Sequence, residues 1–163
     1  MKIIGIDPGL SGAIAILENN KVLNLFDMPV MSEGKKNKRQ LNSSHLVDLI
    51  KENIEKNEEI AVVVEQVNAM PGQGVTSVFN FGQTFGAIKG VCAALNLPIY
   101  FVRPSKWKKH FELINSSKDS SRTKAIEMYP KLSNQLAKKK DVNKSDAILL
   151  ARFFNETRLA EGN

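Results

Sequence analysis

Near its start the chain carries Ile3-Ile4-Gly5-Ile6-Asp7-Pro8-Gly9-Leu10-Ser11-Gly12-Ala13-Ile14-Ala15-Ile16-Leu17, and the rest of the sequence is interpreted around these residues. The two apolar runs in this stretch predict two strands, and the Pro8-Gly9 pair between them predicts a turn. Asp7 therefore falls at the end of the first strand. Because an aspartate before Pro-Gly is more often a turn residue than a catalytic one, other carboxylates must decide its role.

The pattern beyond this stretch predicts an α/β domain. Further strands are expected at 22–26, after turn residues 18–21, at 60–65 and at 98–102. Helices are expected over 43–54, capped by Ser43 or Ser44, over 75–95, over 104–111, from 119 to 130 and from about 143 onward. This order favours a single domain over residues 1–163, with a mixed sheet of three antiparallel and then two parallel strands flanked by helices.

One segment, residues 31–42, lacks any apolar periodicity and is polar and basic. We expect it to be a mobile loop that becomes ordered when a partner binds. The apolar faces of the helix expected at 75–95 are wider than one stripe, so part of this helix is our candidate for a dimer contact. Cys92 lies within that apolar pattern and is expected in the core.

The composition is that of a folded, water-soluble domain, with 42% apolar and 25% charged residues among 163. No apolar run approaches the roughly 20 residues of a membrane span, and no basic segment followed by a long apolar one marks the N-terminus. A single cysteine cannot form an internal disulfide. We therefore expect no membrane contact, no secretion and a reducing compartment.

The net charge of +6 is concentrated in clusters at 35–39, 106–109 and 138–140. Any one such run is usually solvated surface, but three runs that flank acidic positions suit a polyanion such as nucleic acid. The basic composition therefore makes nucleic acid the expected partner.

Four carboxylates stand out by position: Asp7 and Glu65 at strand ends, and Asp141 and Asp146 at the last helix. Strand ends that lie side by side, with a helix packed across them, can bring such acids together. A carboxylate cluster without Cys or His ligands selects Mg²⁺ or Mn²⁺, and two such ions about 4 Å apart suit phosphodiester hydrolysis. Each acid also has a simpler explanation: Glu65 can just end a strand, Asp141 can pair with lysines, and Asp146 can charge a helix start.

Ordered motifs resemble those of RuvC-type Holliday junction resolvases. They are Gly5 to Ala13, Val64-Glu65-Gln66-Val67, Phe81-Gly82-Gln83-Thr84-Phe85-Gly86 and Ser145-Asp146-Ala147. Met70-Pro71-Gly72 resembles the variant known from chloroplast resolvases and related phage-like proteins. The resemblance implies a ribonuclease H-like fold, a homodimer, Mg²⁺ or Mn²⁺ with two ions per site, and paired nicking of four-way DNA junctions. It also implies a place of action in the cytoplasm of a bacterial or phage-infected cell or inside an organelle.

By position, the resemblance makes Asp7, Glu65 and Asp146 metal-binding acids. The fourth is open between Asp141, which we favour, and Asn143. An aromatic that stacks on junction bases in many family members is replaced here by Asn68, so Phe79 and Phe81 are considered for stacking, although core or dimer packing explains them as well. Lys108 aligns with a phosphate-binding lysine beside the scissile bond, whereas the neighbouring Trp107 is expected to be a core residue. The full set of DNA-contacting candidates is Lys36, Lys38, Arg39, Lys106, Lys108, Lys109, Lys118, Arg122, Lys139 and Lys140.

Other classes remain as alternatives. A flap nuclease or a nuclease of RNA–DNA hybrids would use the same acids. An actin-like or sugar-kinase ATPase shares the fold and the glycine-rich first turn, but it needs a second lobe, for which 163 residues leave no room. We therefore expect no nucleotide cofactor. A protein that only binds junctions would not need the acids.

Overall fold

The computed structural model describes residues 1–34 and 38–161, with side chains to residue 158. Its strands are β1 (Lys2–Asp7), β2 (Ala13–Glu18), β3 (Lys21–Asp27), β4 (Val30–Glu33), β5 (Lys38–Leu41), β6 (Ile60–Glu65) and β7 (Ile99–Val102). Its helices are α1 (Ser43–Glu52), α2 (Val75–Ala94), α3 (Pro104–His110), α4 (Ser120–Met128) and α5 (Val142–Glu161), with 3₁₀ turns η1 (Pro130–Leu132) and η2 (Lys139–Asp141). None of the described helices is both long and apolar enough to cross a bilayer.

The main sheet has five strands in the order β3-β2-β1-β6-β7. Strands β1, β2 and β3 pair antiparallel, whereas β1–β6 and β6–β7 pair parallel. The predicted mixed sheet is therefore confirmed. Asn19 and Asn20 have φ values of 47° and 61°, the left-handed geometry of a two-residue hairpin turn, so the predicted turn between β2 and β3 is confirmed as well.

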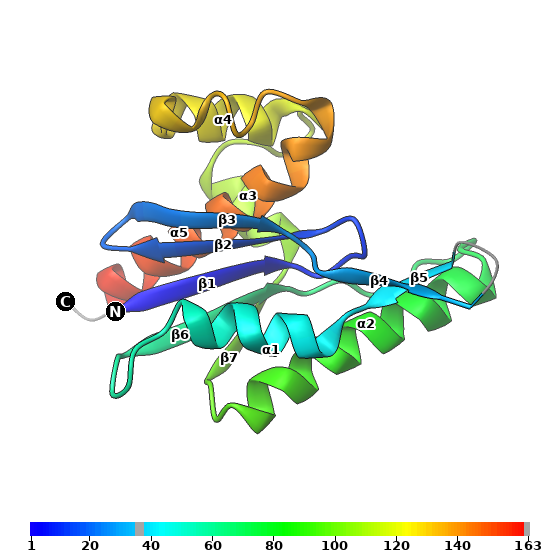
Figure 1. The fold of residues 1–163 in the computed structure, drawn as a ribbon. Helices are drawn as coiled ribbons and strands as arrows, with labels where there is room; N and C mark the ends of the chain where they lie inside the picture. Colours follow the sequence, from blue (N-terminus) through cyan, green and yellow to red (C-terminus); the bar gives the residue numbers. More distant parts are fainter. Residues whose placement is uncertain (35–37, 162–163) are drawn as a thin grey trace.

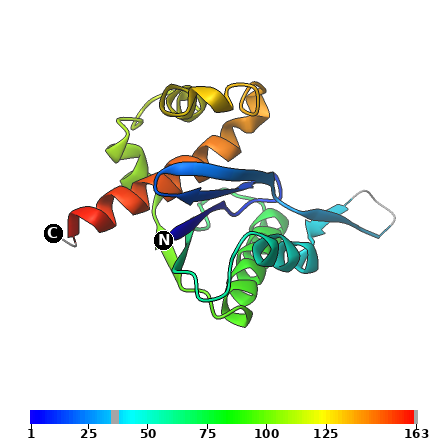
Figure 2. The same ribbon diagram turned by 60° about the vertical axis from the view of Figure 1, so that its left-hand side comes forward.

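Helices cover both faces of the sheet (Figures 1 and 2). One face packs against α1 and the C-terminal half of α2, with Ile4, Ile6, Val62 and Val64 in its core. The other face packs against α5, with α3 and α4 beyond it, and Ile3 and Val63 lie in that core. Because side chains alternate along a strand, Gly5, Asp7 and Glu65 face the α5 side.

Gly5 allows α5 to lie directly on β1. A Cβ at this position would stand 2.3 Å from the carbonyl oxygen of Ala147 and 2.9 Å from the Cβ of Ala151. Gly12 closes the turn after β1, and a Cβ there would stand 2.0 Å from the carbonyl oxygen of Asp7. These two glycines explain the Gly spacing of the opening stretch, and they fix both Asp7 and the start of α5.

The segment at 31–42 corrects our prediction. Instead of a loop it contains a hairpin of β4 and β5, paired from Val30–Leu41 to Glu33–Lys38, and it projects beyond the main sheet (Figure 2). Backbone pairing does not require apolar alternation, and only Leu41 at its base is buried. Residues 35–37, including Lys36, lie outside the described residues.

The N-cap of α1 is also different from the prediction. The side chain of Asn42, not of Ser43 or Ser44, accepts a hydrogen bond from the backbone N–H of His45 at 3.1 Å. Three adjacent residues can all cap a helix, and the pattern alone does not choose among them. The other helix predictions agree with the structure to within about two residues, and Cys92 is buried as expected.

The close approach of β1 and α5 makes a testable prediction. Gly5→Ala should lower the free energy of unfolding by about 1–3 kcal/mol or more, because the added methyl group overlaps the α5 backbone. Urea unfolding in EDTA measures this change. Gly9→Ala is the control, because its Cβ would make only ordinary contacts, at 3.6 Å and beyond. Equal stability of the two variants would contradict the packing described.

Candidate active site

Three acidic residues from different elements gather at one end of the sheet. Asp7 ends β1, Glu65 ends the neighbouring parallel strand β6, and Asp146 lies in the first turns of α5. Strand alternation turns both strand residues toward α5, and the contact of α5 with β1 at Gly5 brings Asp146 beside them. The sequence analysis expected four acids to converge, and three of them, without Asp141, act on one another's charges here.

The charges of the three acids act on one another. Burial, and then the charges of Glu65 and Asp146, raise the pKa of Asp7 from 3.8 to about 7, opposed by Lys108 and Lys118. Burial likewise raises the pKa of Asp146 to about 6, with Glu65 adding to it and a hydrogen bond from Ser121 opposing it. Burial also raises the pKa of Glu65. Like charges held together out of water shift pKa values in this direction.

This group has the chemistry of a divalent-cation site. Oδ1 of Asp146 is buried and has no hydrogen-bond partner, and an unpaired buried carboxylate oxygen is costly unless a cation or proton satisfies it. Oxygen-only ligands suit Mg²⁺ or Mn²⁺. Across residues 1–34 and 38–161, however, no three Asp, Glu, His or Cys side chains already stand in ligand geometry. The acids fit such an ion in charge and burial, and their oxygens must draw closer together to enclose it.

A polar cavity opens beside Asp146. It has a volume of about 360 Å³, and it is lined by Lys108, Leu113, Ser116, Ser117, Lys118, Ser121 and Asp146. The two lysines can bind phosphate oxygens. Among the hydroxyl groups, Ser116 already donates to the carbonyl oxygen of Leu113 at 2.7 Å and Ser121 to Asp146, whereas Ser117 shares a hydrogen bond with Ser120. The sequence analysis had singled out the lysines but not the serines, whose only signal is the Ser-rich composition of residues 116–121.

Glu65 has a partner that the sequence analysis did not foresee. Nε1 of Trp107 donates a hydrogen bond to Oε1 of Glu65 at 2.9 Å. Trp107 is fully buried, as expected of a core residue, but its polar atom reaches the acid cluster. A tryptophan next to a basic run carries no sequence signal of such a contact.

Asp141 and Asn143, the two candidates for a fourth ligand, have different surroundings. Oδ2 of Asp141 accepts from the backbone N–H of Lys138 at 2.8 Å, and Oδ1 lies 3.4 Å from Nζ of Lys144. These are the contacts of a helix cap, and Asp141 is absent from the charges that shift the pKa values of the three clustered acids. The side chain of Asn143 instead donates to the carbonyl oxygen of Ser11, in the turn after Asp7. The role of Asp141 as a ligand stays a prediction.

The basic candidates fall into two groups. Arg122 is committed within the protein, because it forms a bidentate ion pair with Asp119 at 2.7 Å and donates to the carbonyl oxygen of Leu136. The other described candidates are exposed or half-buried on β5, α3, the loop before α4, and η2, and they comprise Lys38, Arg39, Lys106, Lys108, Lys109, Lys118, Lys139 and Lys140. Of these, Lys108 and Lys118 lie close enough to lower the pKa of Asp7.

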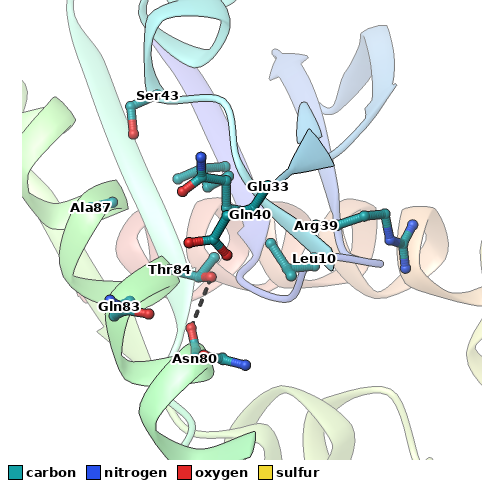
Figure 3. A pocket seen from close by; sticks show the side chains of 10 residues that line it. Leu10, Glu33, Arg39, Gln40, Ser43, Asn80, Gln83, Thr84 and Ala87 are labelled. Carbon is teal, nitrogen blue, oxygen red and sulfur yellow. Dashed lines mark hydrogen bonds between the residues drawn. The ribbon is translucent and has the colours of Figure 1, made fainter. Parts of the chain in front are cut away.

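A second polar pocket lies between the β4–β5 hairpin and α2 (Figure 3). Gln40, Asn80, Gln83 and Thr84 line it, and the hydroxyl of Thr84 donates to the backbone of Asn80 at 3.1 Å. Arg39 extends away from α2 in this view. Polar side chains of the hairpin and of α2 thus face each other across this pocket. None of the three clustered acids lines it.

The two aromatic candidates on α2 differ. Phe79 is 64% exposed. Phe81 stacks on Phe85 at 6.3 Å between ring centroids, and Phe85 in turn packs on Phe101 at 5.5 Å. Phe79 is therefore the freer ring, and base stacking by either residue stays a prediction.

Comparison with known proteins places the chain among junction nucleases. The family model described as "Crossover junction endodeoxyribonuclease RuvC" matches residues 3–153. T. thermophilus RuvC in complex with a Holliday junction substrate matches with a TM-score of 0.62 at 16% identity, over 97% of this chain and 96% of that one. A comparison with curated protein sequences gave no match.

Two further solved structures resemble the chain. Another Thermus thermophilus RuvC structure matches with a TM-score of 0.53 at 18% identity, over 97% of both chains. The fowlpox virus Holliday junction resolvase matches with a TM-score of 0.50 at 18% identity, over 97% of this chain and 99% of that one. These similarities confirm the predicted ribonuclease H-like fold, and the chloroplast or phage-like subtype stays a prediction.

The raised pKa of Asp7 predicts a pH-dependent cost to folding. A carboxyl whose pKa is higher in the folded protein than in the unfolded chain stabilises the fold while it is protonated. This stabilisation by Asp7 is lost as the pH rises from about 4 to 7. In EDTA at pH 8, Asp7→Asn should therefore be more stable than the wild type by roughly 2–4 kcal/mol. At pH 4 the two proteins should unfold alike in urea.

The control for this measurement is Asp119→Asn. The ion pair with Arg122 lowers the pKa of Asp119, so this substitution should reduce stability at pH 8 instead of raising it. An Asp7→Asn protein that is less stable than the wild type at pH 8 in EDTA would show that the acid cluster stores no repulsion.

Proposed function

The chain belongs to the RuvC family of crossover junction endodeoxyribonucleases, and from this membership we propose how its own residues act. The protein is a junction-resolving endonuclease. We propose that Asp7, Glu65 and Asp146 bind the divalent metal ions of this reaction, two Mg²⁺ per site, with Mn²⁺ able to substitute. The observation that carries this proposal is the buried, mutually repelling acid cluster with the unsatisfied Oδ1 of Asp146.

Each part of the cavity has a role in this proposal. Metal ions bound by the three acids would supply an activated water and charge stabilisation of the leaving oxygen. Lys108 and Lys118 bind the phosphate at the scissile bond, because their charges already act on the acid cluster. Ser117 lines the same cavity, and its hydroxyl orients the phosphate by a hydrogen bond when Ser120 donates to it.

The junction DNA is proposed to cross the end of the molecule where β1 and β6 end. The β4–β5 hairpin and the starts of α2 and α5 lie at the same end (Figure 1). β5 belongs to this hairpin, α3 follows the end of β7, and η2 directly precedes α5. The exposed basic residues of these three elements, among them Lys38, Lys106 and Lys140, are the proposed phosphate contacts. Phosphate contacts of this kind position DNA without reading its sequence.

A homodimer is proposed to form through α2. Only the second half of this helix packs on the sheet, through residues from Thr84 onward, and its outer face presents Val75 (86% exposed) and Phe79. The same face carries Gly82, Gly86 and Gly90, where a Cβ would meet no other atom within 4 Å. An apolar, smooth helix face suits close contact with an identical helix, and a two-fold dimer can nick two symmetry-related strands of a junction.

The nuclease proposal predicts a specific substrate and metal dependence. A mobile four-way junction should be nicked symmetrically in Mg²⁺ but not in EDTA, whereas a flap, a duplex and an RNA–DNA hybrid should stay intact. Denaturing gels of labelled strands measure this. Asp7→Asn and Asp146→Asn should each reduce cleavage at least about 100-fold while the junction still binds. Equal cleavage of all four substrates would favour the simpler nucleases, and cleavage in EDTA would overturn the metal-site proposal.

Asp141→Asn, measured in the same assay, separates a cap from a ligand. If Asp141 only caps η2, the variant should lose thermal stability and keep cleavage within about 10-fold, because no metal ligand is removed. If the folded variant is as inactive as Asp146→Asn, Asp141 is the fourth ligand and the three-acid site is incomplete.

The dimer proposal predicts the effect of a charge on α2. The wild type should be a dimer at micromolar concentration, and Val75→Asp should be a monomer, because the buried charge would be unpaired in the contact. Light scattering measures the mass. Leu23→Asp is the control, since Leu23 on β3 is also exposed, at 41%, but lies away from α2. A monomeric wild type, with and without junction DNA, would overturn the proposal.

A further inference from the structure

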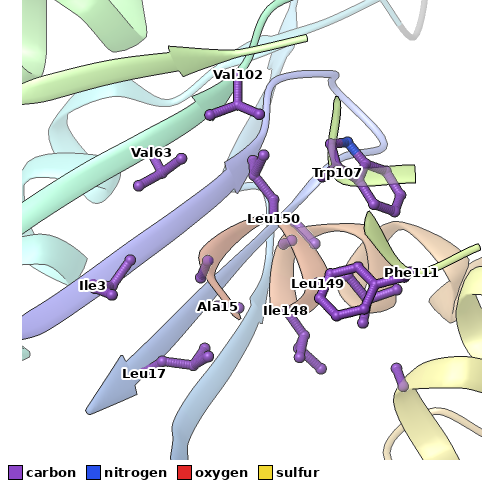
Figure 4. Close-up of a cluster of buried hydrophobic side chains, with 14 of the residues drawn as sticks. Ile3, Ala15, Leu17, Val63, Val102, Trp107, Phe111, Ile148, Leu149 and Leu150 are labelled. Atoms are coloured by element: carbon purple, nitrogen blue, oxygen red, sulfur yellow. The ribbon is translucent and has the colours of Figure 1, made fainter. Parts of the chain in front are cut away.

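Trp107 occupies a special position at the active site. It lies in the first turns of α3, directly after β7, and none of its surface is exposed. Its ring lies above Phe111 in the view of Figure 4, and it belongs to the apolar cluster on the α5 side of the sheet together with Val102 and Leu150. β7 pairs with β6 so that Val102 faces Glu65. The indole is therefore held by the core next to the strand end that carries Glu65.

The polar atom of this ring is directed to a charged group. Nε1 of Trp107 donates to Oε1 of Glu65 at 2.9 Å. A buried indole N–H needs an acceptor, and here the acceptor is a carboxylate, whose charge-assisted bond is stronger than a bond to a neutral group. The hydrogen bond uses one lone pair of Oε1, so the carboxylate keeps further lone pairs for a cation.

The face of the same ring contacts a second residue of the site. Nζ of Lys108 lies 5.3 Å from the centroid of the Trp107 ring, within the range of a cation–π interaction. One rigid side chain thus contacts Glu65 through its edge and Lys108 through its face. The separation of these two side chains depends on the indole between them.

We propose that Trp107 is a positioning residue that holds the Glu65 carboxylate, and with it Lys108, in place for metal and phosphate. The proposal rests on the function proposed above, since it concerns the same acids. A ligand in a metal site is commonly oriented by a hydrogen bond to a neighbouring group, and loss of that bond typically lowers metal affinity or activity 10–100-fold. Trp107 gives Glu65 such a bond from the core of the protein.

Trp107→Phe tests the hydrogen bond, because phenylalanine keeps an apolar ring and loses the N–H. Electron paramagnetic resonance of free Mn²⁺ should show affinity reduced at least about 10-fold without any DNA present. The Mg²⁺ concentration for half-maximal junction cleavage should rise by a similar factor. Junction affinity in EDTA should not change, since the exposed lysines remain.

Phe111→Leu is the matched control. Phe111 lies at the end of α3 in the same core, but it makes no bond to Glu65. This variant should lower the melting temperature and leave Mn²⁺ affinity unchanged. If both variants lose metal affinity in proportion to their stability, Trp107 is only a packing residue and the proposal is wrong.

The wild-type protein offers a second test, which does not depend on how a Trp107 variant folds. Trp107 is the chain's only tryptophan, so one indole N–H resonance and one tryptophan fluorescence signal report on it. Mn²⁺ should quench this fluorescence, and Glu65→Gln should shift the indole resonance. An unshifted resonance would show that the hydrogen bond is absent in solution.

The outcomes separate this inference from the proposed function. If the wild type binds Mn²⁺ and Asp146→Asn does not, the metal site stands, and an unchanged affinity in Trp107→Phe overturns only the positioning role. If the wild type binds no Mn²⁺ and cleaves in EDTA, the metal-site proposal itself fails. Quenching that survives in Asp146→Asn would place the ion elsewhere and overturn both.

Discussion

The contact of α5 with β1 at Gly5 is the constraint on which the site depends. The absence of a side chain lets the carbonyl oxygen of Ala147 approach the strand, and Asp146 precedes this residue. Two residues after Gly5, on the same face of β1, stands Asp7. The distance between strand and helix therefore sets the distance between two of the acids. A helix pushed outward by a single methyl group would separate the acids as well as disturb the core.

This arrangement places repulsion in the interior of the protein. Burial and like charges raise the pKa values of Asp7 and Asp146 to about 7 and 6, so the protein without a cation folds against an electrostatic cost. The apolar core on the α5 side, which includes Ile148 and Leu150, must offset this cost. Functional sites commonly sacrifice stability in this way.

The sequence predicted well what depends on local pattern. The strands β1 and β6 follow from their β-branched runs, and the positions of Asp7 and Glu65 follow from the strand ends. The prediction of a loop at 31–42, where the structure has the β4–β5 hairpin, was wrong because backbone pairing of polar residues leaves no periodic signal in the sequence. Asp141 was favoured as the fourth ligand because its spacing from Asp146 resembles that of chloroplast-type proteins. The structure shows its carboxylate accepting from the backbone N–H of Lys138, the contact of a helix cap, and the ligand role stays a prediction. The bond from Trp107 to Glu65 joins residues 42 positions apart, so no local pattern contains it.

The sheet divides the molecule into two cores, and this division has a consequence for how such a protein diversifies. Residues that alternate along β1 and β6 belong to separate apolar clusters, one with α5 and one with α1 and α2. Substitutions in the α1–α2 layer can repack that layer without moving Asp146 or Trp107, which lie on the opposite face. The face of α2 that is proposed as a dimer contact and the interior that holds the acids can thus change independently of each other.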